Sequence, residues 1–470
     1  MSGAKRIAEV PPASCRDDAR ILPEWDGRVQ IAAFSGVSRA ELLSSFEAFP
    51  VESPWEDLRA YCARTRLDFD GEMPYRLAVA LERGRTDLVR VTAAIRAGLE
   101  AGKENAVVLA EGAYCGSDVA PGALAVLFPG QGTQRPGMFR ELCRLPEMRA
   151  ALAEADAIFA EEDAGDRAVR LSERIHPHPA SGAAAETAHS AALRPTQVAQ
   201  PALAAVGLGA FGALESFGVA CDMAAGHSFG EVTALGAAGV LTRRDGIFAA
   251  RERGRLMGDV RAGASGMLAV RAGAAVVEAV LREESLALTV ADNNAPDQVV
   301  LAGAAEDIEK AAGALRRRGF VVSRLNVAVA FHSRFVAAAR APFLACLRAI
   351  PFSPGRVPVY SNITSAPYPA AAEAARELLA WQLAKPVEFV RMIEAMYAAG
   401  ARTFLEIGPG AVLTGFTEAI LEGLPHHAFS MDASSGKRSG LFDLAAALAR
   451  LAALGYRVAV SRWDPLPERR

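Results

Sequence analysis

The sequence is short of the features that mark secreted, membrane-spanning and metal-binding proteins. Its 470 residues include six cysteines with no C-x-x-C pair, which argues against a zinc site or a disulfide framework and favours a reducing cytoplasm. We expect no transmembrane helix, which needs about 18 or more apolar residues without charge, and the charged stretch Met1 to Arg20 is unlike a signal peptide. The net charge of −3 argues against nucleic acid as the main partner. These absences predict a cytoplasmic protein with no metal, no nucleic-acid partner and no membrane contact.

What the sequence does contain is a long alternation of strand and helix patterns. A chain of this length predicts roughly two to three domains. After a tail at 1–27, residues 28–121 read as a small α+β module without a cluster of nucleophile, base or metal ligands. A larger α/β domain is predicted at 122–262 and 326–430, where the apolar run Leu124 to Phe128 indicates a buried parallel strand. Between its halves, residues 263–325 follow the order β-α-β-β-α-β of a ferredoxin-like unit, and a further segment spans 431–470.

One stretch of the larger domain predicts a nucleophile. The residues Gly226 to Gly230 separate a mostly apolar run from a helix pattern and place Ser228 at the apex of a strand–turn–helix. Glycines on both sides allow the sharp turn, and N–H groups at the helix start point toward the serine. The segment therefore predicts a serine hydroxyl held clear of the sheet, as a possible nucleophile, and a core like that of the α/β-hydrolases.

A serine nucleophile needs a base and donors for the developing oxyanion. Of the seven histidines, His332 is the best candidate base because it follows an apolar run and precedes a helix start. His227 adjoins the serine but would point away from it, which suggests a supporting role. The backbone N–H of Phe229 is one expected donor, and the Gly-flanked Gln131, after the strand that ends at Phe128, is the second.

Three arginines compete for a further role on the helix predicted at Arg243 to Met257. An arginine fork binds a carboxylate through two hydrogen bonds, which lysine cannot do. If Arg251, Arg253 or Arg255 were buried beside Ser228, it would select an acyl group that ends in a carboxylate. Spacing alone does not choose among the three.

Several motifs together give the chain a family resemblance. Over about residues 28 to 460 it resembles the malonyl-CoA:acyl-carrier-protein transacylases and the acyltransferase domains of polyketide and polyunsaturated-fatty-acid synthases. The finer likeness, which rests on Phe229 and the Thr233-Ala234-Leu235 that follows, is to the iterative enediyne and polyunsaturated-fatty-acid branch. The motifs that carry the resemblance are Gly130-Gln131-Gly132-Thr133-Gln134, Gly226-to-Gly230 with Glu231, Arg253-Gly254-x-x-Met257, Asn294-x-Pro296-x-Gln298, Ala330-Phe331-His332-Ser333, Tyr360-Ser361-Asn362 and Glu406-Ile407-Gly408-Pro409-Gly410.

The resemblance implies a role for each candidate residue. Ser228 would be the nucleophile, His332 the base and Arg253 the ligand of the malonyl carboxylate, while a backbone carbonyl of Glu388 would orient His332. Further expected site residues are the oxyanion donors Gln131 and Phe229 and the substrate-binding residues Phe331, Val329, His227, Gln200 and Asn294. Phe331 favours a small malonyl pocket, whereas Val329 departs from the histidine of many malonyl-specific relatives, so a methylmalonyl- or acetyl-selective enzyme stays an alternative.

The resemblance also implies the reaction and its partners. It implies transfer of malonyl from malonyl-CoA through an acyl-serine to the phosphopantetheine thiol of an acyl carrier protein, with no bound cofactor. Residues 28–121 would be the linker domain after a ketosynthase, and 431–470 the linker that follows the acyltransferase, so the chain would be part of a megasynthase with further domains as partners. Arg316-Arg317-Arg318 is a candidate docking patch for the acidic carrier.

Two other functions remain open from the sequence. A serine hydrolase or thioesterase shares the elbow around Ser228, but its histidine usually lies near the chain end, whereas a whole subdomain separates Ser228 from His332 here and a long segment follows it. A scaffold with an inactive acyltransferase is disfavoured because Ser228, His332 and Arg253 are all present.

Overall fold

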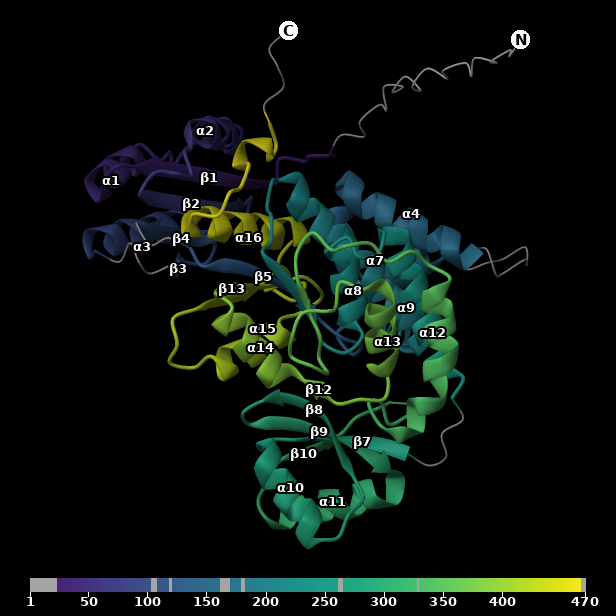
Figure 1. Ribbon diagram of the computed structural model, residues 1–470. Helices are drawn as coiled ribbons and strands as arrows, with labels where there is room; N and C mark the ends of the chain where they lie inside the picture. Colours follow the sequence, from purple (N-terminus) through teal and green to yellow (C-terminus); the bar gives the residue numbers. More distant parts are fainter. Residues whose placement is uncertain are drawn as a thin grey trace, which may run out of the picture.

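The computed structural model describes residues 23–102, 108–117, 121–160, 170–178, 182–260, 265–327 and 329–465, which build three sheet-based units (Figure 1). Most of the tail predicted at 1–27 lies outside the described residues. The predicted α/β fold class, with its parallel sheet and ferredoxin-like insertion, is confirmed. The domain boundaries themselves stay predictions.

The N-terminal module is an antiparallel sheet with helices on one face. Its strand order is β1 (Val29–Gly36), β2 (Tyr75–Glu82), β4 (Ala113–Ser117), β3 (Val108–Ala110). Three helices pack on the face that carries Phe34 and Leu77, namely α1 (Arg39–Glu47), α2 (Trp55–Asp68) and α3 (Leu88–Glu100). The opposite face, with Ile31 and Ala78, packs against the C-terminal α16 (Gly440–Leu454) and joins the main core.

The main domain is built on a five-stranded parallel sheet. Its order is β11 (Val359–Tyr360), β6 (Met223–Gly226), β5 (Ala123–Phe128), β13 (Ala401–Glu406), β14 (His427–Ser430). Side chains alternate along β5: Val126 and Phe128 face the large core, while Ala125 and Leu127 face the helices α14 (Phe389–Ala398) and α15 (Val412–Ile420). The other helices of this domain are α4 (Pro146–Ala160), α5 (Leu171–Ile175), α6 (Ala183–Ala192), α7 (Thr196–Ser216), α8 (Gly230–Ala237), α9 (Arg243–Gly258), α12 (Arg340–Arg348) and α13 (Ala372–Trp381).

Helix α7 is the one described helix long and apolar enough to cross a membrane. An 18-residue window of this 21-residue helix has a mean hydropathy of 1.3, and 89% of that window is buried inside the fold. It packs between α4, α8 and α9. Length and composition alone are weak grounds for a membrane span, and the burial fits the core helix of a globular domain.

The inserted subdomain has the strand order of a ferredoxin-like fold plus one added strand. Its sheet runs β10 (Val322–Arg324), β7 (Ser265–Val270), β9 (Gln298–Ala304), β8 (Thr289–Ala295), with the two-residue β12 (Val387–Glu388) beside β8. Helices α10 (Ala274–Glu283) and α11 (Ala305–Arg317) cover one face. Met267 and Val300 lie on the other face, in a cluster with Ala330 of the main domain. The sequence did not predict that β12, from the main-domain segment, pairs parallel to β8.

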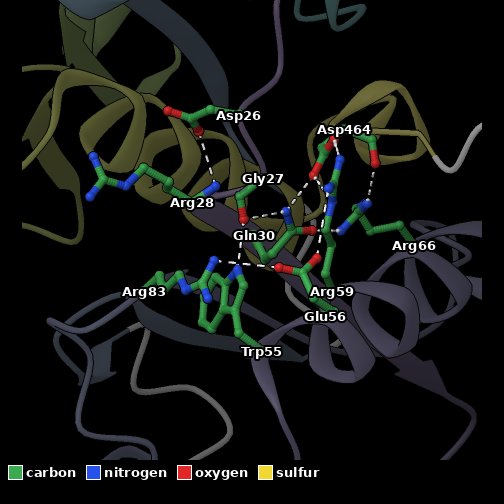
Figure 2. A network of polar contacts seen from close by, with 10 residues as sticks. All are labelled: Asp26, Gly27, Arg28, Gln30, Trp55, Glu56, Arg59, Arg66, Arg83 and Asp464. Carbon is green, nitrogen blue, oxygen red and sulfur yellow. Dashed lines mark hydrogen bonds and ion pairs between the residues drawn. The ribbon is translucent and has the colours of Figure 1, made fainter.

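The C-terminal segment returns to the N-terminal module and is anchored there. Trp463 is fully buried and donates its indole N–H to the backbone oxygen of Val29 at 3.0 Å. The buried carboxylate of Asp464 accepts two hydrogen bonds from Arg59, at 2.8 and 2.6 Å, and its backbone oxygen accepts one from Arg66 at 3.0 Å (Figure 2). Charge-assisted and bidentate contacts of this kind fix geometry as well as adding stability, so residues 463–464 complete the N-terminal module.

Candidate active site

The turn between β6 and α8 holds Ser228 in a conformation that its glycines make possible. Ser228 has a left-handed φ of 51°, as expected for a serine on a strained elbow. A Cβ on Gly226 would lie 2.0 Å from the backbone carbon of Gly230, and a Cβ on Gly230 would lie 2.0 Å from the backbone oxygen of Phe128. Neither contact is possible for real atoms, so the predicted need for glycine on both sides of the serine is confirmed.

Asn362, just after β11, fixes the elbow from the neighbouring strand. Its Oδ1 accepts the backbone N–H of Ser228 at 2.6 Å, and its Nδ2 donates to the backbone oxygen of Gly226 at 2.7 Å. The side chain therefore bridges the residue that ends β6 and the nucleophile itself. The sequence contained Asn362 only as part of the Tyr360-Ser361-Asn362 motif, and its clamping position could not be predicted without the pairing of β11 with β6.

Glu231 supports this clamp from the first turn of α8. Its fully buried carboxyl accepts the backbone N–H of Asn362 at 2.6 Å, and its other oxygen accepts the hydroxyl of Tyr368. Burial raises the pKa of Glu231 to about 7, while the Tyr368 hydroxyl, the Asn362 N–H and the positive charge of Arg253 oppose the rise. The residues that hold the nucleophile are thus tied into a buried polar network.

Ser228 and His332 form the pair that the sequence predicted. The serine Oγ lies 2.6 Å from Nε2 of His332. The other ring nitrogen, Nδ1, lies 3.0 Å from the backbone oxygen of Gln382 and 3.1 Å from that of Lys385. Because carbonyl oxygens only accept, Nδ1 carries the proton in the neutral ring, and Nε2 is left as the acceptor for the serine hydroxyl.

The expectation for Glu388 is wrong. The carbonyls that orient His332 belong to Gln382 and Lys385, in the turn after α13, where Leu383 also accepts the backbone N–H of His332 at 3.2 Å. Glu388 instead lies in β12. Its backbone N–H donates to the backbone oxygen of Asn362, and its side-chain Oε2 accepts a hydrogen bond from Nδ2 of Asn293. Pairing of β12 with β8 commits Glu388 to the small subdomain, so the turn before it supplies the contacts.

The ring of His332 is held neutral. Burial lowers its pKa to about 3, and the positive charge of Arg253 and the neighbouring His227 act in the same direction. A histidine with this pKa is unprotonated at neutral pH. It is therefore ready to take the serine proton without first losing one of its own.

The two residues that the sequence predicted as oxyanion donors lie in the same cavity as the serine. Gln131 and Phe229 both line the cavity that contains Ser228. Within the described part of the chain, the backbone N–H of neither residue has a hydrogen-bond acceptor. Unpaired N–H groups beside a nucleophile are what a developing oxyanion requires, at about 3 kcal/mol of transition-state stabilisation for a donor.

Of the three competing arginines, Arg253 is the one in the cavity. Its side chain is 1% exposed and donates from Nη2 to Oε1 of Gln382 at 2.8 Å, while its Nε has no partner among the described residues. No described carboxylate lies within 4.0 Å of its guanidinium, so its charge is available to a ligand. Arg251 lies over the ring of Phe159 and Arg255 pairs with acidic neighbours on and after α9.

Of the five remaining predicted pocket residues, three line the cavity and two do not. The cavity has a volume of about 430 Å³, and Gln200, His227 and Phe331 line it. Asn294 lies behind them, with Oδ1 2.6 Å from Nε2 of His227. Val329 is buried in the main hydrophobic core and does not line the cavity, so its predicted substrate contact is wrong.

The sequence missed one acidic group in the cavity wall. Asp292 of β8 is 7% exposed and lines the cavity, and its Oδ1 has no hydrogen-bond partner among the described residues. Burial alone raises its pKa to about 7. No motif marks this residue, because its position depends on how the open face of the small sheet meets the main domain.

Nothing in the described residues suggests a metal centre or a disulfide. No group of three or more His, Cys, Asp or Glu side chains there could hold a metal ion. The five described cysteines are all free.

Comparison with known proteins agrees with this arrangement. The model of the family described as "Acyl transferase domain" matches residues 126–434. Among curated proteins, the chain is 34% identical over 307 residues to the spectinabilin polyketide synthase system protein NorB of Streptomyces orinoci, covering 65% of this chain but only 14% of that protein. It is also 33% identical to the malonyl CoA-acyl carrier protein transacylase of Bacillus subtilis, covering 63% of this chain and 90% of that protein.

A solved structure extends the likeness beyond the matched region. The acyltransferase domain from the second module of the salinomycin polyketide synthase superposes with a TM-score of 0.69 at 29% identity. The superposition covers 92% of this chain and 95% of that one, so it reaches well beyond the residues that the family model matches.

Proposed function

The chain belongs to the acyl transferase domain family, and from that premise we propose that it moves a malonyl group from malonyl-CoA to the phosphopantetheine thiol of an acyl carrier protein. The observation that carries the proposal is the pairing of Ser228 with a neutral His332 next to an arginine without a carboxylate partner. The first two supply acyl transfer, and Arg253 supplies the preference for a carboxylate-bearing acyl group. No resident cofactor is needed for this chemistry.

The first half-reaction loads the enzyme. Ser228 Oγ attacks the thioester carbonyl while its proton passes to Nε2 of His332, and the N–H groups of Gln131 and Phe229 donate to the oxyanion. The carbon–sulfur bond then breaks. The coenzyme A thiolate takes the proton from His332 and leaves, and malonyl-Ser228 remains.

The second half-reaction reverses these roles with a different thiol. The carrier's phosphopantetheine thiol gives its proton to His332 and its sulfur attacks the acyl-serine carbonyl. The carbon–oxygen bond breaks, and Ser228 Oγ recovers the proton from His332. Loading and unloading alternate in one site, so ping-pong kinetics are expected.

Selectivity for malonyl rests on charge first and on size second. Arg253 is buried, and a buried guanidinium gains more from a substrate carboxylate than an exposed one does. Phe331 lines the cavity and leaves little room for an α-methyl group, although one such group is worth only about 1–3 kcal/mol. Competition between malonyl-CoA and methylmalonyl-CoA measures how much this size limit contributes to selectivity.

A hydrolase or thioesterase is the second candidate because it would use the same pair of residues. The cavity is lined by both polar and apolar groups, and in this candidate water takes the place of the carrier thiol. Rapid loss of the acyl group from Ser228 without a carrier would favour this candidate. A stable acyl-enzyme that is discharged only by a carrier thiol favours the transferase.

We also propose that the chain works within a larger synthase in the cytoplasm. The aligned part of the chain spans a small fraction of relatives such as NorB, and the free cysteines are compatible with a reducing compartment. The proposed ketosynthase linker is the N-terminal module.

Carrier docking at Arg316-Arg317-Arg318 has weak support, since Arg318 pairs with Glu283 and Glu284 at 2.9 and 2.7 Å. Reversing the charge of the exposed Arg316 should raise the carrier KM if docking occurs there.

Mass spectrometry of the intact protein tests the proposed function. Wild type mixed with malonyl-CoA should gain one malonyl mass, and Ser228→Ala should gain none. Arg253→Ala should lose malonyl loading by orders of magnitude while loading from acetyl-CoA stays equal or rises. Malonylation of Ser228→Ala would overturn the nucleophile, and unchanged malonyl loading of Arg253→Ala would overturn the carboxylate site.

A further inference from the structure

Gln382 contacts both functional groups of the site through different atoms. It lies at the end of α13, where its backbone N–H donates to the oxygen of Leu378 at 3.1 Å. Its backbone oxygen lies 3.0 Å from Nδ1 of His332, and its side-chain Oε1 accepts from Nη2 of Arg253 at 2.8 Å. The residue is 1% exposed, so both contacts are made out of water. One residue thus fixes the proposed base through its backbone and the proposed carboxylate ligand through its side chain.

We propose that the side chain of Gln382 is the positioning residue that sets selectivity for an acyl group bearing a carboxylate, because it holds the guanidinium of Arg253 in the cavity. This inference rests on the proposed function and adds to it a residue outside the cavity wall. Orientation of His332 depends on the backbone of Gln382 and on Lys385, not on the side chain. Selectivity and catalysis can therefore be separated at this one position.

The chemistry of an amide suits this task better than that of a carboxylate. The neutral Oε1 holds Nη2 without cancelling the positive charge, whereas a glutamate would form a buried ion pair with Arg253 and compete with the substrate. Burial lowers the pKa of Arg253 to about 10, and Glu231, whose negative charge opposes this shift, is itself engaged by Asn362 and Tyr368. With Nη2 held, Nε still lacks a partner among the described residues. A substrate carboxylate is an acceptor that satisfies it.

Loss of the amide should free Arg253 to adopt other rotamers. Arg253 also lies over the ring of Phe229, with 6.0 Å between the guanidinium carbon and the ring centre, which is a weak contact at that distance. The hydrogen bond to Gln382 is thus the main directional restraint that the described residues place on the guanidinium. Loss of the net free energy that a hydrogen bond to a charged group typically contributes corresponds to a decrease of about ten-fold or more in malonyl loading.

The test compares loading from malonyl-CoA with loading from acetyl-CoA in four proteins. They are wild type, Gln382→Leu, Gln382→Glu and the control Gln197→Leu, which makes the same chemical change at an exposed position of α7. Gln382→Leu should lower kcat/KM for malonyl about ten-fold and leave acetyl loading within about two-fold. Gln382→Glu should lower malonyl loading further, because the new carboxylate occupies Arg253. Gln197→Leu should match wild type with both donors.

A second measurement excludes a merely structural effect. The rate at which a neutral fluorophosphonate modifies Ser228, followed from pH 5 to pH 8, reports the Ser228–His332 pair without using Arg253. This profile should be the same in wild type and Gln382→Leu. Equal loss of malonyl loading, acetyl loading and phosphonate reactivity would overturn the inference, because it would mean that the side chain supports the whole site. If Gln382→Leu does not fold, the same comparison in Gln382→Glu decides.

Arg253→Ala in the same series separates this inference from the proposed function. If Arg253→Ala loses malonyl loading but both Gln382 variants keep it, the role of Gln382 is overturned and the function stands. If Arg253→Ala also keeps malonyl loading, the carboxylate site is overturned, and the role of Gln382 falls with it.

Discussion

Replacement of Asp292 by asparagine should stabilise the protein more at high pH than at low pH. The native carboxyl is buried in the cavity wall, one of its oxygens has no partner in the described structure, and its pKa is raised from 3.8 to about 7. A raised pKa in the folded state means that the folded protein prefers the protonated acid. Ionisation above pH 4 therefore lowers the free energy of unfolding. This penalty grows until the pH passes about 7.

The expected size of the effect follows from the two pKa values. Each unit of difference corresponds to about 1.4 kcal/mol, so the full penalty above pH 7 is about 4 kcal/mol. Between pH 5 and pH 8 it grows by about 2–3 kcal/mol. Asparagine has nearly the same shape and carries no charge, so its own cost is independent of pH. The difference in unfolding free energy between Asp292→Asn and wild type should therefore rise by about 2–3 kcal/mol over this range.

Urea denaturation at pH 5 and at pH 8 measures this difference. The change between the two pH values is used because it cancels any constant cost of the new amide. It also cancels other carboxyls whose pKa burial raises, such as Glu231 and Glu406, since both proteins contain them. Asp297→Asn is the matched control, because Asp297 lies in the exposed turn after β8 and its side chain is 65% exposed.

Two results would refute the reasoning. An advantage of Asp292→Asn that is the same at both pH values would mean that the carboxyl is not ionised at the cost of folding. A control that shows the same pH dependence would mean that the effect arises from net charge and not from burial. Unchanged malonyl loading by Asp292→Asn would add that the carboxyl does not contact the substrate.

Three further predictions concern the elbow, the C-terminal anchor and the base. Gly230→Ala should abolish loading and lower the melting temperature, because its Cβ would meet Phe128, whereas Gly415→Ala, at an open helix position, should stabilise the protein by up to about 1 kcal/mol in the same thermal scans. Trp463→Ala should destabilise the protein by about 3–5 kcal/mol in urea, since it removes a fully buried indole and a hydrogen bond. Because the pKa of His332 is lowered to about 3, phosphonate inactivation should show no inflection near pH 6.5, and an inflection there would mean that the ring is not desolvated.

Local pattern predicted the parts of the site that depend on local structure. The elbow at Ser228 needs a strand, a glycine-flanked turn and a helix, and all three are readable within about ten residues. The same holds for the strand that ends at Phe128 and for the helix that carries Arg253. What spacing left open was which of the neighbouring arginines enters the cavity. The family resemblance proposed Arg253, and the packing of α9 places Arg253 there.

Contacts made by backbone atoms or across chain segments were beyond prediction from the residues. A carbonyl that orients a histidine can belong to any residue type, so nothing in the sequence distinguished Gln382 and Lys385 from Glu388. Asn362 and Asp292 have no local signature either, since one acts through the pairing of β11 with β6 and the other through the meeting of two subdomains. The position of Val329 in the family motif predicted a contact with the substrate, whereas its side chain is buried in the hydrophobic core.

The turn from Gln382 to Glu388 explains why so many of these contacts depend on one short segment. Its first half, as far as Lys385, surrounds His332 and holds Arg253, both of which belong to the main domain. Its second half is β12, whose two residues extend the sheet of the small subdomain beside Asp292 and Asn293. A strand of two residues is too short to show a periodic pattern. No sequence pattern marks a main-domain strand that pairs with the sheet of the inserted subdomain. The cavity wall and the base are therefore positioned by residues only a few places apart, so a change in how the two subdomains pack reaches His332 through this turn as well as through the cavity wall at Asp292.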